Sequence, residues 1–328
     1  MNPVLVTGGA GFIGSHVCEA FLKRRIPVIC VDNLNNFYSP ELKLKNLDEV
    51  VKTSKLMPGA VFNFEKIDIL DTSSLASLFG RYNFSCVVHL AAYAGVRPSI
   101  ENPALYFGTN VMGTLNLLDQ MKSHGVKKFL FASSSSVYGN NKKVPFAETD
   151  PVDNPISPYA ATKKAGELLC FTYHHLFGID TACLRFFTVY GERQRPDLAI
   201  HKFTRLISEG KPIQMFGDGA TRRDYTYIGD IVDGVTKAYD YVTKNQGVYD
   251  IFNLGESNTI SLSWMISAIE AAIGKKAVIN RMPVQPGDVE LTNADISKAV
   301  RVIGYAPKTD FDDGIKIFVK WFSDNFHA

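Results

Sequence analysis

The first 190 residues alternate short apolar runs with longer amphipathic stretches, and this alternation limits the possible folds more than any other feature. The short runs are rich in β-branched residues and apolar nearly throughout, as strands buried on both faces are. They cover residues 4–6, 28–31, 62–67, 86–88, 129–131 and 182–184. Helical spacing predicts helices at about 15–25, 73–81, 102–123 and 158–177. Such strands are joined by right-handed crossovers, so we expect an α/β chain with a doubly wound parallel sheet.

After about residue 190 the regular alternation stops. Loops rich in Gly, Pro, Arg and Asp appear at 191–198, 216–224 and 283–288. Further elements are a possible strand at 249–254, which could return to the main sheet, and helices near 261–273 and 312–324. We therefore expect a larger domain made of residues 1–190 and about 226–256. A smaller α/β domain, interleaved with it, would consist of about 191–225 and 257–328.

The composition excludes several classes of protein. Of the 328 residues, 46% are hydrophobic and 21% charged, with a net charge of +2, so we expect a folded globule without a field that recruits nucleic acid or membranes. No apolar stretch approaches the roughly 18–20 residues of a spanning helix, and the N-terminus lacks the basic start of a signal peptide. Five cysteines without CxxC spacing argue against disulfides or a metal site and favour a reducing cytoplasm.

The first predicted strand leads directly into the run GGAGFIG, residues 8–14. Glycines at positions 8, 11 and 14 allow a tight turn and a close approach to a pyrophosphate, which then lies at the positive end of the next helix. Asp32 ends the second strand, where an acidic residue suits the ribose 2′-hydroxyl of NAD and repels the 2′-phosphate of NADP. Asn33 and its neighbours offer no arginine for that phosphate. The pattern predicts a Rossmann-type site for NAD.

A second group of polar residues follows the strand at 129–131, in the serine run 133–136. Ligands bind over the carboxyl ends of strands in such sheets, so these hydroxyls should face the cofactor. Further along, Tyr159 and Lys163 are four residues apart and share one face of a predicted helix. Ser157, followed by proline, is a suitable cap for that helix. The pair can therefore act as a unit.

Together these motifs resemble the extended short-chain dehydrogenase/reductase superfamily, in particular its nucleotide-sugar epimerase and dehydratase branch. The resemblance spans essentially the whole chain. It rests on the segments GGAGFIG, HLAA (89–92), SSSSVYG (133–139), YAATK (159–163), LRFF (184–187) and RDY (223–225). It implies that NAD contacts Gly8, Gly11, Phe12, Ile13, Gly14, Asp32, Asn33, Asp68, Ile69, Leu90, Ala91, Ala92, Tyr159 and Lys163. It also implies a homodimer formed through the helices near 102–123 and 158–177.

The resemblance implies that Tyr159 takes the O4 proton of a sugar while its C4 gives a hydride to NAD⁺. A free tyrosine has a pKa near 10, so a base that acts near pH 7 needs a shift of roughly three units. We expect the Lys163 ammonium and the positive nicotinamide ring to favour the phenolate. Ser134, which matches the family's catalytic Ser/Thr, would hydrogen-bond the same hydroxyl.

Nearby residues separate the activities of this branch. Family dehydratases carry an Asp-Glu pair directly after the catalytic Thr, whereas this chain has Ser135 and Ser136, which cannot replace two carboxylates in acid–base elimination. Thr188 replaces an asparagine common in hexose epimerases. With the segments 94–97, 195–199 and 285–289, it resembles the UDP-glucuronate 4-epimerase group. The residues Glu-Arg-Gln at 192–194 depart from that group, which has small and aromatic residues there.

We hypothesise that Ser135, Ser136 and Thr188 hold a C6 carboxylate out of alignment with the C4 carbonyl, which would prevent decarboxylation of the keto intermediate. The alternative is that these hydroxyls only satisfy backbone groups.

Guanidinium groups suit a diphosphate. Candidate substrate-binding residues are Arg97, Ser135, Ser136, Arg185, Thr188, Arg195, Arg223 and Asp288, with Arg193 as a further possibility. Asp230 is expected to cap a helix that starts at Ile231.

The sequence therefore predicts an NAD-dependent enzyme that epimerises a UDP-sugar at C4 through a 4-keto intermediate, with UDP-glucuronate as the first choice. UDP-N-acetylglucosamine or UDP-glucose epimerisation and UDP-glucuronate decarboxylation are alternatives. A non-catalytic NAD sensor is the alternative from another class, although a sensor has no need of all three catalytic residues.

Overall fold

The structure is a computed structural model that describes residues 1–283 and 291–326. Its centre is a seven-stranded sheet in the order β10-β6-β5-β4-β1-β2-β3, with every neighbouring pair parallel. The strands are β1 (Val4–Thr7), β2 (Val28–Asp32), β3 (Phe62–Lys66), β4 (Cys86–His89), β5 (Lys128–Ser134), β6 (Asp180–Phe186) and β10 (Tyr249–Leu254). The predicted doubly wound parallel sheet is confirmed, and the late strand returns to its edge.

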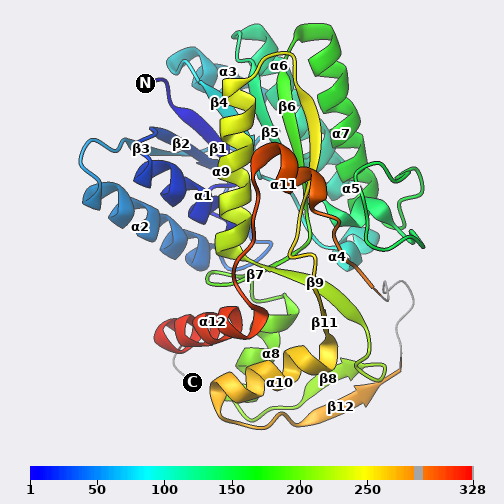
Figure 1. The fold of residues 1–328 in the computed structure, drawn as a ribbon. Coiled ribbons are helices and arrows are strands. Elements are labelled where there is room, and N and C mark those ends of the chain that lie inside the picture. The colour runs from blue at the N-terminus through cyan, green and yellow to red at the C-terminus, as the bar shows by residue number, and fades with distance from the viewer. Residues whose placement is uncertain (284–290, 327–328) are drawn as a thin grey trace.

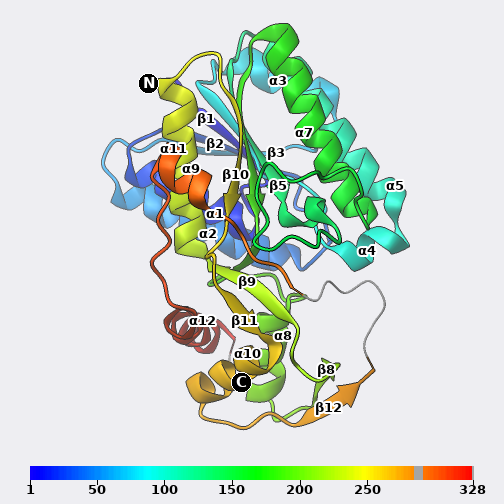
Figure 2. The ribbon, with the colours of Figure 1, turned by 45° about the vertical axis from the view of Figure 1, so that its right-hand side comes forward.

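Helices cover both faces of this sheet, because successive side chains of each strand point to opposite sides (Figures 1 and 2). In β1, Val4 and Val6 belong to a core shared with α1, α2, α9 and α11, whereas Leu5 belongs to a second core shared with α3, α6 and α7. The helices are α1 (Phe12–Lys23), α2 (Pro40–Leu56), α3 (Thr72–Arg81), α6 (Gly113–Ser123), α7 (Pro158–Phe177), α9 (Ile228–Lys244) and α11 (Ser297–Ile303).

The segment predicted as one helix over 102–123 is more complex. It contains α5 (Pro103–Tyr106), a π-helical turn (Phe107–Met112) and α6, and α4 (Val96–Glu101) precedes it. Asn102 caps α5 with its side-chain oxygen, which accepts the N–H of Leu105, and so separates α4 from α5. The polar helix α2 was not predicted, because its buried side includes the polar residues Lys43 and Asn46 as well as Leu47 and Val50.

The smaller part of the chain lies beside one end of the main sheet (Figure 1). It contains a three-stranded sheet, a two-stranded sheet and three helices around a separate apolar core. These elements are β7 (Thr188–Tyr190), β8 (Ile213–Phe216), β9 (Arg222–Tyr227), β11 (Thr259–Ser261), β12 (Ile279–Met282), α8 (Ala199–Ser208), α10 (Leu262–Ile273) and α12 (Phe311–Asn325). None of the helices in the described residues is both long and apolar enough to cross a membrane.

Two details differ from the sequence-based prediction. The helix α11, assigned by sequence to the smaller domain, packs with its Ala299 in the same core as α1 and α9. The helix α9 begins at Ile228, so Asp230 lies in its first turn and is not its cap. The carboxylate of Asp230 instead accepts the backbone N–H groups of Lys308 and Thr309, which attaches the segment before α12 to the first turn of α9.

Candidate active site

A pocket of about 330 Å³ opens at the carboxyl ends of β1, β2, β4, β5 and β6. Carboxyl ends of parallel strands meet at one edge, and the order of the strands reverses between β1 and β4, which is where ligands bind in open α/β sheets. The loop after β7 contributes Arg195 and Leu198 from the other side. Residues far apart in the sequence therefore form one cavity.

The glycine run forms the floor of this pocket. Gly8 has φ +72°, and a Cβ atom there would lie 2.7 Å from the backbone N of Ala91. A Cβ on Gly14 would lie 2.2 Å from the carbonyl oxygen of Gly8. Gly11 stands at the N-cap of α1 without a side-chain cap, and the first turn of that helix has no acidic residue. The positive helix end is thus open to an anion, as a pyrophosphate requires.

Asp32 lies at the end of β2 and is 8% exposed. Its two carboxylate oxygens accept the N–H of Ala10 at 3.2 Å and of Leu34 at 2.9 Å. Burial raises the pKa of this carboxyl, and the backbone bonds oppose that effect. Asn33 donates to Asp68 at 2.9 Å, so the ends of β2 and β3 are joined beside the pocket. These features fit an adenosine ribose and so a bound NAD.

The structure brings most of the predicted cofactor-binding residues together. Those that line the pocket are Gly8, Gly11, Phe12, Ile13, Gly14, Asp32, Asn33, Ile69, Leu90, Ala91, Ala92, Tyr159 and Lys163. Asp68 lies behind them as a partner of Asn33. Sequence reasoning missed Lys43, whose Nζ donates to the carbonyl oxygen of Asn35 at 2.8 Å and contributes to the same wall. The only signal in the sequence is a lysine at helical spacing from Leu47 and Val50.

The three predicted catalytic residues also line this pocket. Ser157 caps α7 by accepting the N–H of Ala160 at 3.1 Å, so Tyr159 and Lys163 lie on its first two turns. The Nζ of Lys163 donates to the carbonyl oxygen of Ala132 at 2.7 Å. Burial lowers the pKa of Lys163 to about 8.

The electrostatics of Tyr159 differ from the sequence-based expectation. Burial raises the pKa of its phenol, while a hydrogen bond with Ser134 and the positive charge of Arg195 oppose that rise. The Nζ of Lys163 lies 6.0 Å from the centre of the same ring. In the protein without its cofactor, burial thus outweighs the groups that favour the phenolate, and the expected lowering of the pKa would need the positive charge that NAD⁺ would bring.

The serine turn is folded on itself. The hydroxyl of Ser134 accepts the backbone N–H of Ser136 at 3.2 Å and donates to its Oγ at 3.1 Å. Ser135 and Ser136 begin a 3₁₀ turn outside the pocket lining, whereas Thr188 lines the pocket. One of the three hydroxyls proposed to hold a carboxylate thus faces the cavity directly.

The candidate arginines have different environments. Arg195 lines the pocket, with Asp197 bound to its Nη2 at 2.7 Å and the Phe37 ring 5.1 Å from its Cζ. Arg97, outside the lining, lies over the ring of Phe216, 5.6 Å from its centre. Arg223, also outside, donates to the carbonyl oxygen of Arg222 at 2.9 Å. Asp288 falls outside the described residues.

Arg185 is the most buried of the candidate arginines. It is 1% exposed in β6, and its Nε and Nη2 donate to the two oxygens of Glu167 at 2.8 and 2.9 Å. The same carboxylate accepts the hydroxyl of Ser133 at 2.6 Å, and the Tyr138 ring lies 4.8 Å from the guanidinium carbon. Arg185 is not among the residues that line the pocket, and its Nε and Nη2 are occupied by Glu167. Its contacts join α7 to β5 and β6 beneath the catalytic residues.

Comparisons with known proteins show which family the chain belongs to and which enzymes it resembles. The family described as GDP-mannose 4,6 dehydratase matches residues 5–318, and the chain belongs to that family. It is 46% identical to a UDP-glucuronate 4-epimerase of Thermodesulfobacterium geofontis, over 99% of this chain and 97% of the other. The crystal structure of the UDP-glucuronic acid 4-epimerase from Bacillus cereus, in complex with UDP-glucuronic acid and NAD, superposes with a TM-score of 0.90 at 38% identity and covers 99% of this chain and 100% of that one.

A UDP-glucose 4-epimerase of Thermotoga maritima, solved with UDP-glucose, is similar at a TM-score of 0.88 and 32% identity, covering 99% of this chain and 100% of that one. The predicted resemblance to the nucleotide-sugar branch of this superfamily is thereby confirmed. The family name includes dehydration, but the residues after Ser134 are serines and not the acids that dehydration needs.

Proposed function

We propose that this protein catalyses the NAD-dependent epimerisation of UDP-glucuronate at C4, giving UDP-galacturonate. The observation that carries the proposal is the convergence of Ser134, Tyr159 and Lys163 at the end of a glycine-floored dinucleotide pocket. The relative named as a UDP-glucuronate 4-epimerase, at 46% identity, and the solved neighbour with UDP-glucuronic acid and NAD support this substrate.

The side chains divide the work of the reaction. Tyr159 would hold the O4 proton of the sugar and return it after the hexose has turned, while Ser134 hydrogen-bonds the same oxygen. The Nζ of Lys163, fixed by the carbonyl oxygen of Ala132, places a positive charge 6.0 Å from the centre of the tyrosine ring. When bound, NAD would accept the C4 hydride and return it to the opposite face. Since no net oxidation occurs, the cofactor should stay bound through many turnovers.

The sugar is expected to be acidic because neutral donors stand where the dehydratases carry carboxylates. A carboxylate at C6 would be repelled by an Asp-Glu pair, whereas Thr188 in the pocket offers a hydroxyl. Arg195, on the loop after β7, adds positive charge to the same cavity. We propose that these two residues receive the C6 carboxylate and the diphosphate end of the substrate between them.

Proton NMR of separate incubations with UDP-glucuronate, UDP-N-acetylglucosamine and UDP-glucose, with no added NAD, tests this function. The expected result is UDP-galacturonate from the first, without release of CO₂. If only a neutral sugar reacts, C4 epimerisation through the keto intermediate still holds, but the proposed binding of a C6 carboxylate is wrong. A pentose product with CO₂ would identify a decarboxylase. If no sugar reacts, with or without NAD, the chain is a dinucleotide sensor or takes another nucleotide sugar.

We propose that the cofactor domain consists of residues 1–190 and about 226–256, with α11 packed on it, and that the remainder holds the UDP. Two cores flank the main sheet and a third fills the smaller part, which supports the division. Hydrogen exchange with and without UDP checks it. UDP alone should protect amides of the β7–β9 sheet and α8 more than those of α3 and α6. Equal protection in both parts would contradict it.

We also propose a homodimer. Large apolar side chains are exposed along α4, α5, the π-helical turn and α7, although α7 packs against that turn and buries its other side. They are Ile100, Leu105, Phe107, Met112, Leu168, Phe171 and Leu176. A second copy of this face would cover them. In light scattering, Leu168→Glu with Phe171→Glu should give a monomer, and Ile317→Glu on α12 should not. An unchanged mass for the double variant would contradict the proposal.

A reducing cytoplasm is the location that we propose. All five cysteines are buried free thiols, and burial raises the pKa of Cys170 and Cys86, which keeps these thiols protonated. Thiol titration of the denatured protein, isolated from its own cells, should give five free groups. Fewer than five would oppose this location.

A further inference from the structure

The loop that follows β7, residues 191–198, contains the three residues that depart from the expected pattern: Glu192, Arg193 and Gln194. Arg193 has φ +63°, in the left-handed region that side chains disfavour. A residue keeps such a conformation only where its surroundings hold it. The contacts of Arg193 must therefore hold this conformation, although Arg193 has no assigned part in the reaction.

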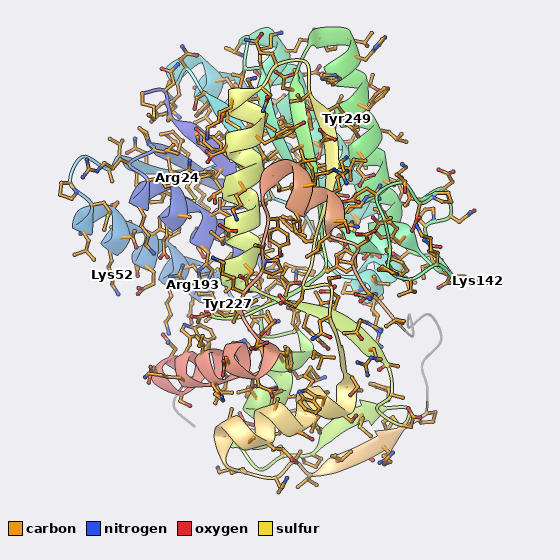
Figure 3. The ribbon with its side chains drawn as sticks, viewed as in Figure 1. Arg24, Lys52, Lys142, Arg193, Tyr227 and Tyr249 are labelled. Atoms are coloured by element: carbon orange, nitrogen blue, oxygen red, sulfur yellow. The ribbon has the colours of Figure 1, made fainter. Side chains whose placement is uncertain are left out.

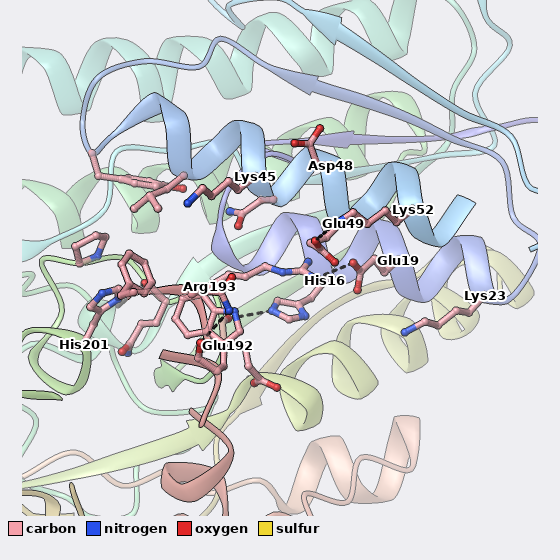
Figure 4. A pocket seen from close by; sticks show the side chains of 18 residues that line it. His16, Glu19, Lys23, Lys45, Asp48, Glu49, Lys52, Glu192, Arg193 and His201 are labelled. Atoms are coloured by element: carbon pink, nitrogen blue, oxygen red, sulfur yellow. Dashed lines mark hydrogen bonds and ion pairs between the residues drawn. The ribbon is translucent and has the colours of Figure 1, made fainter. Parts of the chain in front are cut away.

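Arg193 reaches back to the helix that follows the glycine turn. Its Nη2 lies 2.8 Å from the Oε1 of Glu19, and its Nη1 donates to the Oγ of Ser15 at 3.2 Å. The side chains of Arg193 and Glu19 are only 12% and 11% exposed. Figure 3 shows Arg193 where the larger and smaller parts of the molecule meet, and Figure 4 shows the contact from close by. An ion pair shielded to this degree is stronger than one in open solvent.

The neighbouring residue makes two further contacts with other elements. The Nε2 of His16 lies 3.0 Å from the carbonyl oxygen of Glu192, and since that oxygen only accepts, the imidazole donates. Burial lowers the pKa of His16 to about 3, so the ring is neutral. The carboxylate of Glu192 accepts the hydroxyl of Tyr227 at 2.9 Å. One residue of the loop is thus attached to both α1 and β9.

The far side of the loop is attached as well. The side-chain Nε2 of Gln194 donates to the carbonyl oxygen of Val189 at 3.2 Å. The backbone carbonyl oxygen of Gln194 accepts from the Nδ1 of His201 on α8 at 2.7 Å. Gln194 is 3% exposed. The next residue, Arg195, is the one that enters the pocket beside Phe37. The attachments therefore immediately precede the loop's functional side chain.

We propose that Arg193 is a positioning residue for substrate binding: its contacts with Glu19 and Ser15 fasten the 191–198 loop to α1 and so hold Arg195 over the pocket. The inference rests on the proposed function for its effect on turnover. Ser15 directly follows Gly14, so the same helix that receives the pyrophosphate also fixes the substrate loop. The residues at 192–194 then serve to anchor this loop, and the loop is not a freely moving lid.

The test compares Arg193→Met with the wild-type enzyme carrying its bound NAD. We expect the KM for UDP-glucuronate to rise roughly tenfold, with kcat within about twofold and the NAD content unchanged, because the loop orients substrate and does not react. Glu19→Gln should give a similar rise, and Arg193→Met with Glu19→Gln should be no worse than either alone. Arg193→Lys, which keeps the charge, should recover part of the loss.

A matched control removes another arginine–carboxylate pair from the same helix. Arg24, at the end of α1, pairs with Asp240 on α9 away from the loop, so Arg24→Met should leave KM unchanged. If Arg193 has a merely structural role, Arg193→Met and Arg24→Met should both lower the thermal stability and leave KM unchanged. That result, or an equal fall in kcat at constant KM, overturns the proposal.

Hydrogen exchange separates failure of this inference from failure of the proposed function. In Arg193→Met, the amides of residues 191–198 should exchange at least about tenfold faster, while those of α1 keep their rates. This holds whichever sugar the enzyme uses. If the wild-type protein turns over no UDP-sugar but the loop still exchanges faster in the variant, the function is wrong and the attachment stands. Unchanged loop exchange means that the attachment is wrong.

Discussion

The two halves of the site are built in different ways. On the cofactor side, Gly8, Gly11 and Gly14 come from one short run between a strand and a helix, and backbone geometry alone requires glycine at positions 8 and 14. On the substrate side, Thr188 and Arg195 come from a strand and a loop whose positions depend on contacts with distant elements. Local constraints therefore define where NAD would bind, whereas tertiary contacts define what it would react with.

The largest expected effect is on the chemistry shared by both halves. Tyr159→Phe should lower kcat by roughly 10³-fold or more, because the O4 proton then has no acceptor, with little change in NAD content. Steady-state kinetics and the absorbance of released cofactor measure both quantities. A Tyr106→Phe variant, whose ring contacts that of Tyr159, is the matched control. A kcat within tenfold of wild type would mean that another group takes the proton.

Arg185→Met tests whether Arg185 belongs to the substrate side. It would remove the two-pronged ion pair of the buried Glu167 carboxylate and leave it only the Ser133 hydroxyl and the more distant Lys164, so the free energy of unfolding should fall by about 3–5 kcal/mol. Urea unfolding measures this loss, and Arg185→Met with Glu167→Met should recover much of it because both charges are then absent. Weaker UDP binding with unchanged stability would instead restore the diphosphate role predicted from sequence.

Gly14→Ala tests the claim that backbone geometry defines the cofactor half. Its Cβ would meet the carbonyl oxygen of Gly8, which cannot move without opening the turn, so unfolding free energy should fall by about 2 kcal/mol and the protein should purify without NAD. Gly80→Ala in α3, where no atom lies within 4 Å of the added carbon, should be neutral or slightly stabilising. Equal behaviour of the two variants would contradict the claim.

The smallest effect is a pH dependence of stability caused by Lys163. Its pKa is about 8 in the folded protein, below the value of 10.5 expected in the unfolded chain. Between these values the unfolded state binds more protons, so stability rises with pH, by at most about 1.4 kcal/mol per unit. Unfolding free energies at pH 7.5, 8.5 and 9.5, minus those of Lys163→Met, isolate this contribution. If the difference in unfolding free energy between the two proteins does not change with pH, Lys163 is more solvated than its contacts in the structure indicate.

The contrast between the cofactor side and the substrate side also explains how much of the fold and the site could be predicted from the sequence. The sheet, the glycine turn and the Tyr159–Lys163 helix follow from local patterns: apolar runs, glycines at fixed spacing, and Ser157 before a proline. A strand motif does not reveal which partner an arginine meets, so the sequence leaves open whether Arg185 binds a diphosphate or has a structural role, whereas the structure places Glu167 opposite it. Lys43 and the attachments of residues 192–194 depend on elements brought together only by folding.

The central claim is that one hydride leaves C4 and returns to the same carbon. It is tested most directly by incubating UDP-glucuronate with the enzyme in D₂O without added NAD and recording the proton spectrum of the product. The account predicts UDP-galacturonate that keeps its proton at C4. Deuterium at C4 would show that this hydrogen exchanges with solvent, and would contradict a hydride transfer that is contained within the site.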